Sequence, residues 1–298
     1  MSPHRPSRRR VLQAAALGLG GSMGLGHAAR AAATGPRIVA VGGAITETVY
    51  ALGAAGTLVG VDTTSLYPEA ARALRSVGYA RALSAEGVLS LAPTAVLASD
   101  EAGPPAVLRQ LEAARVPVHM LPAEHRIEGL AQRTRAVATL LGRAEAGQAL
   151  AVQWQREAEA ARAEAQRLAG GRPAPRVLFV LAHAMNAVRV AGRDTAADAM
   201  LTLAGARNAL APTAGYVPLN AEAALAAAPE VLLVTDQGLQ AAGGIDGLLR
   251  APGLAATPAG RARRVLSLDA LWLLGFGPRL PSAIRTLAQG LHGRGPAT

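Results

Sequence analysis

A tyrosine and an arginine stand two residues apart in the segment Gly78-Tyr79-Ala80-Arg81, just before a short helix that we expect to begin after Ser84. A free phenol has a pKa of about 10, and a guanidinium beside it favours the ionised form. The pair could therefore supply an anionic oxygen donor at neutral pH. The structural alternative is a half-buried loop tyrosine whose hydroxyl meets a backbone carbonyl.

Two other side chains have the chemistry and the position to contact a ligand. His183 follows the hydrophobic run Val177–Leu181, at the carboxyl end of a predicted strand, where open α/β sheets place ligands. Arg279 lies in a glycine-rich loop, and a guanidinium binds a carboxylate in a two-pronged fashion. The alternatives are a hydrogen-bonded structural histidine and an ordinary surface arginine.

Motifs for enzyme chemistry are missing from residue 34 onward. That part of the chain contains no P-loop, no G-x-S-x-G elbow, no H-E-x-x-H and no G-x-G-x-x-G fingerprint. The chain also has no cysteine, which excludes a disulfide framework, a thiolate metal site and a lipid anchor on cysteine. We therefore expect a protein that is not an enzyme.

Composition points to a folded protein without a nucleic-acid surface. Of the 298 residues, 51% are hydrophobic and 17% are charged, which is typical of a globular chain. The net charge is +10, but residues 1–33 contain five arginines and no acidic residue. The remaining arginines are scattered rather than gathered on one predicted face, so we expect no nucleic-acid partner.

The N-terminus has the features of an export signal. The run Ser7-Arg8-Arg9-Arg10-Val11-Leu12-Gln13 resembles the twin-arginine motif, and an apolar, glycine-rich stretch follows it. That stretch is too short and too polar to span a membrane stably. We expect residues 1–33 to be a signal peptide, with a mature chain that begins near 32–34 and is located in the periplasm.

Hydrophobic runs alternate with helical segments from Arg37 onward. Ile38–Val41 predicts a strand, Gly42-Gly43 a turn, and Thr46 the cap of the first helix. Val116–Leu121 is predicted to be a later strand. This alternation is typical of an α/β protein with largely parallel sheets.

A repeat indicates two similar halves. Segments 84–97 and 220–233 each contain a capping residue, a glutamate in the first helical turn, and a proline before a buried strand. The segment Glu145 to Leu168 predicts one long helix between the halves. We expect two lobes, each with a mostly parallel sheet flanked by helices, and a ligand cleft at their facing strand ends. The expected divisions are an N-terminal lobe over 34–141, a connecting helix over 142–170 and a C-terminal lobe over 171–298. One continuous sheet with an extra-long helix is the alternative.

These features resemble a known family, the helical-backbone class of ABC-importer binding proteins, and within it the haemin-binding branch. The resemblance runs from about Arg37 to Leu291. The residues that carry it are Arg37-Ile38-Val39-Ala40-Val41-Gly42-Gly43, Thr46-Glu47, Leu52-Gly53, Val59-Gly60-Val61-Asp62, Val77-Gly78-Tyr79-Ala80-Arg81-Ala82-Leu83-Ser84-Ala85-Glu86-Gly87, Ala191-Gly192-Arg193-Asp194-Thr195 and Leu273-Leu274-Gly275-Phe276-Gly277-Pro278-Arg279. The branch assignment depends mainly on Gly78-Tyr79-x-Arg81.

The resemblance implies that haem b is the transported ligand rather than a catalytic cofactor. By this resemblance, Tyr79 ligates the haem iron through its phenolate and Arg81 supports it by hydrogen bonding. A phenolate is a hard anionic donor that suits ferric iron, and tyrosine is an established haem ligand. His183 would be a second-lobe contact, Arg279 would pair with a propionate, and Tyr216 would lie in the cleft. Asn186 and Arg189 could reach haem from the loop that carries His183.

The resemblance also implies partners. Glu86 and Glu222, at matching places in the repeat, would dock a monomeric protein onto an inner-membrane ABC permease, which works with its ATPase. Each glutamate could instead serve its own helix, where a carboxylate in the first turn contributes less than about 1 kcal/mol. The alternatives for function are a cobalamin-binding or ferric-siderophore-binding protein of the same class, and a periplasmic enzyme of unknown chemistry.

Overall fold

The structure, a computed structural model, describes residues 35–181 and 188–293. The predicted signal peptide, residues 1–33, lies outside the described residues, and so do His183 and Asn186. No helix within the described ranges is both long enough and apolar enough to cross a membrane.

Four parallel strands form the first sheet, in the order β2-β1-β5-β6. They are β1 (Ile38–Val41), β2 (Leu58–Val61), β5 (Ala95–Ser99) and β6 (Val118–Leu121). The helices of this half are α1 (Gly43–Ala51), α2 (Ala85–Leu89), α3 (Pro105–Ala113) and α4 (Ile127–Leu140), and a short hairpin adds β3 (Gly78–Tyr79) and β4 (Ala82–Leu83). All four residues of β1 are buried, as expected for a parallel strand covered on both faces.

The second sheet is mixed. Its strands run in the order β10-β8-β7-β11-β12, and β9 also pairs with β7. They are β7 (Arg176–Leu181), β8 (Arg189–Ala191), β9 (Arg207–Asn208), β10 (Tyr216–Pro218), β11 (Val231–Thr235) and β12 (Val265–Leu268). The pairs that β11 makes with β7 and β12 are parallel, whereas β8 pairs antiparallel with both β7 and β10. The helices are α6 (Ala196–Leu203), α7 (Ala221–Ala227), α8 (Asp236–Ala241), α9 (Gly244–Leu249), α10 (Pro258–Arg261), α11 (Ala270–Leu274) and α12 (Leu280–His292).

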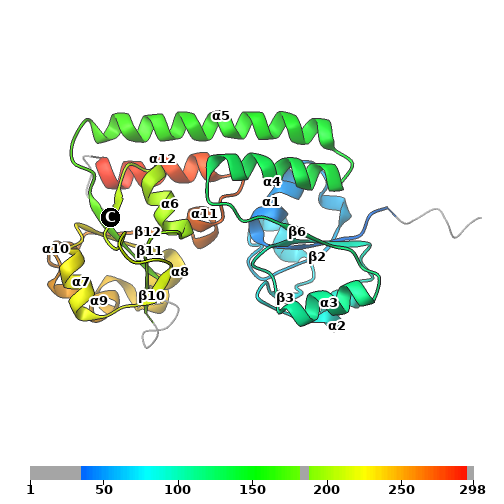
Figure 1. Ribbon diagram of the computed structural model, residues 1–298, viewed down its shortest axis with the longest axis horizontal. Coiled ribbons are helices and arrows are strands. Elements are labelled where there is room, and N and C mark those ends of the chain that lie inside the picture. The colour runs from blue at the N-terminus through cyan, green and yellow to red at the C-terminus, as the bar shows by residue number, and fades with distance from the viewer. Residues whose placement is uncertain (1–34, 182–187, 294–298) are drawn as a thin grey trace, which may run out of the picture. The chain divides into compact units, whose positions relative to one another are not determined.

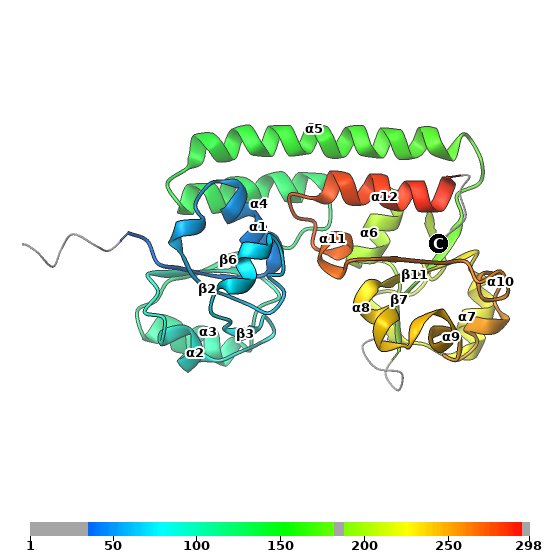
Figure 2. The same ribbon diagram turned by 180° about the vertical axis from the view of Figure 1, so that it is seen from behind.

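One long helix, α5 (Ala144–Ala169), connects the two sheets along the chain. Helix α4 lies beside one half of α5, and α12 lies beside the other half (Figures 1 and 2). The buried face of α5 carries small residues at helical spacing, Ala158, Ala161 and Ala165, so the neighbouring helices can approach closely. The helix ends at Gly170, whose left-handed φ of 58° suits glycine.

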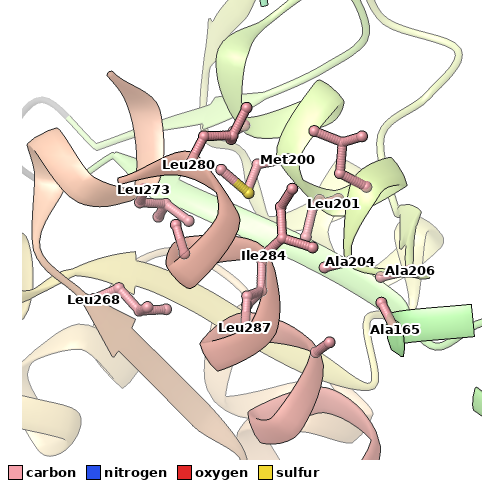
Figure 3. Packing of buried hydrophobic residues seen from close by; sticks show 14 of the residues in the cluster. Ala165, Met200, Leu201, Ala204, Ala206, Leu268, Leu273, Leu280, Ile284 and Leu287 are labelled. Atoms are coloured by element: carbon pink, nitrogen blue, oxygen red, sulfur yellow. The ribbon is translucent and has the colours of Figure 1, made fainter. Parts of the chain in front are cut away.

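The core of the second half forms where α6, α11 and α12 pack beneath α5. Figure 3 shows Met200 and Leu201 of α6 facing Ile284 and Leu287 of α12, all of them buried. Ala165 of α5 belongs to the same cluster. The long helix is therefore part of this core as well as a connection.

The repeat predicted from the sequence is present in three dimensions. In each copy a side chain caps the start of the helix. The Ser84 hydroxyl accepts a hydrogen bond from the Gly87 backbone amide, and the side-chain Oδ1 of Asn220 accepts one from the Ala223 backbone amide. The strands that follow, β5 and β11, each lie between two parallel neighbours of their sheets. The predicted fold class, two α/β lobes joined by a long helix, is confirmed. The exact lobe boundaries stay a prediction.

Two local predictions were wrong. Thr46 does not cap the first helix, because the helix already begins at Gly43 and Thr46 is buried inside it. Its hydroxyl is hydrogen-bonded to the Ser65 hydroxyl at 2.7 Å, a tertiary partner that the local sequence does not indicate. The strand predicted over Val116–Leu121 begins only at Val118.

Candidate ligand-binding site

A cleft of about 880 Å³ opens between the two lobes. Its walls come from the carboxyl ends of strands in both sheets and from the segments that follow them, the usual ligand position in open α/β sheets. The N-terminal lobe contributes Tyr79, Arg81, Glu101, His125 and Arg133. The C-terminal lobe contributes Arg189, Tyr216 and Gln237. Among the lining residues that the structure describes, three arginines against one glutamate make the charge predominantly positive, which suits an anionic ligand.

A small hairpin places Tyr79 in the cleft. Strands β3 and β4 pair antiparallel, and Tyr79 lies opposite Ala82. Gly78 begins the hairpin at a φ of +95°, a backbone conformation that favours glycine. The Thr63 amide donates to the Gly78 carbonyl, and the Gly103 amide donates to the Ala80 carbonyl, both at 2.9 Å. The hairpin is therefore tied to the segments that follow β2 and β5.

The Tyr79 side chain is accessible. It is 47% exposed, and its hydroxyl makes no hydrogen bond to another of the described residues. Within the described ranges, no backbone carbonyl accepts a hydrogen bond from this hydroxyl, as the structural alternative would require. Tyr79 places a phenol oxygen on the wall of the cleft.

Arg81 has a different partner from the one suggested by its spacing. Its guanidinium Nη2 lies 2.7 Å from Oε2 of Glu101, and this hydrogen bond raises the pKa of Arg81. The charges that Tyr79 and Tyr216 carry when ionised act on Arg81 in the same direction. Arg81 therefore lies within electrostatic reach of both tyrosines while it is bound to a carboxylate.

Tyr216 lines the opposite wall of the cleft and is more buried than Tyr79. Its ring packs edge-on against Phe179 at 6.5 Å between centroids. Burial, with a smaller contribution from the Glu101 charge, raises the pKa of the Tyr216 hydroxyl. This tyrosine is therefore a neutral phenol at neutral pH and a poorer anionic donor.

Several cleft residues were not anticipated from the sequence, among them His125 and Arg133. His125 follows β6, and its ring packs against Phe276 at 5.2 Å between centroids. Burial lowers its pKa, so the imidazole is neutral at neutral pH. Arg133 on α4 is 5% exposed and donates to the carbonyls of Gly275 and Phe276. Burial lowers the pKa of Arg133 to about 10, which leaves it charged.

A signal for some of these residues was present in the sequence. Glu101 and His125 follow the strands β5 and β6 by a few residues, as His183 follows β7. The rule that singled out His183, a polar residue after a buried strand, applies equally to them. Arg133 lies in the middle of a helix, and its sequence neighbours do not indicate that it reaches the cleft.

Arg279 is bound within the protein rather than free for a ligand. Its guanidinium forms a two-pronged pair with Glu47 and lies over the Tyr67 ring at 4.1 Å. It is not among the residues that line the cleft. Arg279 was expected to pair with a carboxylate of the ligand, but its partner in the structure is the buried carboxylate of Glu47. Arg189, in contrast, lines the cleft.

Glu86 and Glu222 are exposed in the first turns of α2 and α7. Neither lines the cleft. Both helices lie on the side of the described chain opposite α5 (Figures 1 and 2). The two glutamates are therefore exposed to solvent on that side.

Two α/β lobes with a ligand cleft between their strand ends define the class of two-lobed solute-binding proteins. The chain belongs to the periplasmic binding protein family, which matches residues 38–271.

Three solved structures resemble this chain over most of its length. BhuT, a periplasmic haem-binding protein in complex with two haems, is 51% identical, with a TM-score of 0.81 over 86% of this chain and 97% of that one. RhuT, a periplasmic haem-binding protein from Roseiflexus sp. RS-1 in its apo form, is 44% identical, with a TM-score of 0.84 over 87% and 98%. A periplasmic haem-binding protein from Pseudomonas aeruginosa is 38% identical, with a TM-score of 0.81 over 87% and 94%.

Curated relatives match a smaller part. The vitamin B12-binding protein of Vibrio campbellii is 28% identical over 130 residues, 43% of this chain and 47% of that protein. The vitamin B12-binding protein of Yersinia pestis is 33% identical over 89 residues, 30% of this chain and 32% of that protein. The chain thus spans less than half the length of these curated relatives in the alignments.

Proposed function

We propose that this protein captures haem in the cleft between its lobes, with Tyr79 as the iron ligand, and delivers it to an inner-membrane ABC permease in the periplasm. The observation that carries the proposal is the accessible Tyr79 hydroxyl, which lines the cleft of a fold shared with haem-binding proteins. Phenolate is a hard donor for ferric iron, and one donor on an open wall permits both capture and release. Haem is the cargo, and the protein carries it without transforming it.

The other cleft residues suit the rest of a haem molecule. Arg189 adds positive charge to the wall, and a guanidinium pairs well with a propionate. Tyr216 offers a flat aromatic surface on the opposite wall, fixed against Phe179. Arg279 takes no part in this arrangement because Glu47 holds it.

A haemin titration tests the proposal. The wild-type mature chain should give a saturable shift of the Soret band and the charge-transfer band of a phenolate-ligated ferric haem. Tyr79→Phe should lose that band and bind much more weakly, because it retains the ring and lacks the donor. Tyr50→Phe, on α1 and outside the cleft lining, is the matched control and should behave as wild type. An unchanged spectrum and affinity in Tyr79→Phe would refute the assignment.

Cobalamin is the second candidate because the curated relatives bind vitamin B12 by name. It would be the ligand if cobalamin quenched the tryptophan fluorescence saturably and haemin gave no saturable change. The haemin titration and a parallel cobalamin titration therefore decide between the two ligands.

The permease contact is proposed to use Glu86 and Glu222. Their exposure at the starts of the two repeated helices supports a two-point contact with a two-fold permease. The double substitution Glu86→Ala with Glu222→Ala should abolish binding to the permease–ATPase complex and leave the haemin affinity unchanged. Normal permease binding by this variant would contradict the proposal.

Export is proposed to use the twin arginines. Replacing Arg8 and Arg9 with lysine in the full chain should block export and cause the unprocessed precursor to accumulate in the cytoplasm. Cleavage and periplasmic recovery of that variant would show that another signal directs the chain.

A further inference from the structure

We propose that Glu101 holds Arg81 in the ligand-free protein and releases it to the Tyr79 phenolate when a ferric porphyrin binds, so that Glu101 sets the affinity of the site. This inference rests on the proposed function, since it assigns a role to a residue next to the same iron ligand. Glu101 is thereby a positioning residue that acts through Arg81.

The first step concerns the partners available to Arg81. Among the described residues, its guanidinium forms a charged contact with Glu101 at 2.7 Å and makes no hydrogen bond to Tyr79. All three side chains line the same cleft. In the ligand-free arrangement the carboxylate holds Arg81, and a phenolate at Tyr79 would compete with it for the guanidinium.

The second step concerns the cost of an exchange. The side chains of Arg81 and Glu101 are 58% and 49% exposed. An exposed ion pair of this kind changes an equilibrium constant by a factor of only about two to five, because water screens it. The ion pair with Glu101 is thus strong enough to orient Arg81 and weak enough to be broken when a ligand binds.

The third step concerns what a bound porphyrin changes. A flat apolar ligand over Tyr79 excludes water, and charge interactions strengthen in the drier surroundings. An iron-bound phenolate there needs a cationic hydrogen-bond donor, and Arg81 is two residues away on the same hairpin. Glu101 can turn to water when released, since half of its side chain is already exposed.

A double-mutant cycle with haemin as the probe tests the exchange. Glu101→Gln should tighten haemin binding by about two- to fivefold, the factor expected for an exposed ion pair. In the Arg81→Ala background, the same substitution should have no effect, because the residue through which it acts is gone. The matched control is Asp246→Asn, which breaks an equally short, exposed pair with Arg263 outside the cleft and should leave haemin affinity unchanged.

Two results would overturn the inference. One is an unchanged affinity in Glu101→Gln while the wild type still binds haemin through Tyr79. The other is equal tightening in the wild-type and Arg81→Ala backgrounds, which would show that Glu101 simply repels the propionates. If the wild type shows no phenolate-ligated spectrum, the proposed function itself has failed, so the two failures are distinguishable.

Discussion

Arg279 and Glu47, 232 residues apart in the chain, form a two-pronged ion pair between the start of α12 and helix α1. The Arg279 Nη2–Glu47 Oε1 distance is 2.6 Å and the Nε–Oε2 distance is 3.0 Å. Glu47 is 4% exposed, and the guanidinium carbon of Arg279 lies over the Tyr67 ring, 4.1 Å from its centre. This pair ties the N-terminal lobe to the C-terminal part of the chain.

Removing the arginine should destabilise the protein more than neutralising the glutamate. Arg279→Ala leaves a carboxylate buried without its partner, and breaking a buried pair in this way costs about 3–5 kcal/mol. Glu47→Gln should cost less, because the Arg279 side chain is 26% exposed and can reach water. Urea denaturation at pH 7 measures both. Arg285→Ala, which breaks a half-exposed pair with Glu164, should cost less than about 1 kcal/mol, and an equal effect of Arg279→Ala would contradict the argument.

The cost of Arg279→Ala should also depend on pH. Burial raises the pKa of Glu47 in the folded protein, so its ionisation opposes folding as pH rises from 4.5 through the folded value. The hydrogen bond and the positive charge of Arg279 lower the pKa of Glu47, so the loss of Arg279 raises this pKa further. The destabilisation should therefore be smaller at pH 4, where Glu47 is mostly protonated in both states, than at pH 7. Denaturation at the two pH values tests this, and a constant difference between variant and wild type would refute it.

Arg133 should contribute to stability through backbone carbonyls. Arg133→Met keeps the aliphatic volume but removes the donor to the buried Phe276 carbonyl and to the half-buried Gly275 carbonyl. An unsatisfied buried group costs about 1–3 kcal/mol. The free energy of unfolding from urea titration should fall by that amount, and a variant as stable as wild type would show that water replaces the guanidinium.

His125 should make the protein less stable in acid. Burial lowers its pKa below 6.5 in the folded state, so the unfolded chain binds the proton more readily. Stability is lost as pH falls through 6.5 toward the folded value. His125→Gln should therefore lose less unfolding free energy than wild type between pH 7.5 and pH 5. Parallel pH dependences of the two proteins would contradict this expectation.

Gly147 should resist the usual helix-stabilising substitution. An added Cβ would lie 2.1 Å from the Ala138 Cβ, where α5 crosses α4. Gly147→Ala should destabilise by about 1–3 kcal/mol through overpacking, although alanine is the better helix former by about 1 kcal/mol. Gly87→Ala in α2, where the nearest atom is 3.5 Å away, is the matched control and should be neutral or stabilising. Thermal or urea unfolding gives the sign of each change.

The sequence by itself determined the elements and their repetition. Hydrophobic runs such as Ile38–Val41, the helix-forming composition of residues 145–168 and the capped repeat at Ser84 and Asn220 are all local patterns. Local patterns are visible because a strand, a helix or a cap depends on residues within a few positions of one another. The position of Tyr79 just before the helix capped by Ser84 is likewise a local feature that the sequence shows directly.

The tertiary structure alone decided which charged groups meet. Arg81 binds Glu101, twenty residues away, and Arg279 binds Glu47. Arg133 of α4 donates hydrogen bonds to the carbonyls of Gly275 and Phe276, more than 140 residues further along the chain. These pairings depend on which strand ends and helices come together in space, and no periodicity in the sequence encodes a contact between positions so far apart. A spacing of two residues suggested that Arg81 serves Tyr79, but the fold also brings the Glu101 carboxylate within 2.7 Å of Arg81, and opposite charges at that distance attract.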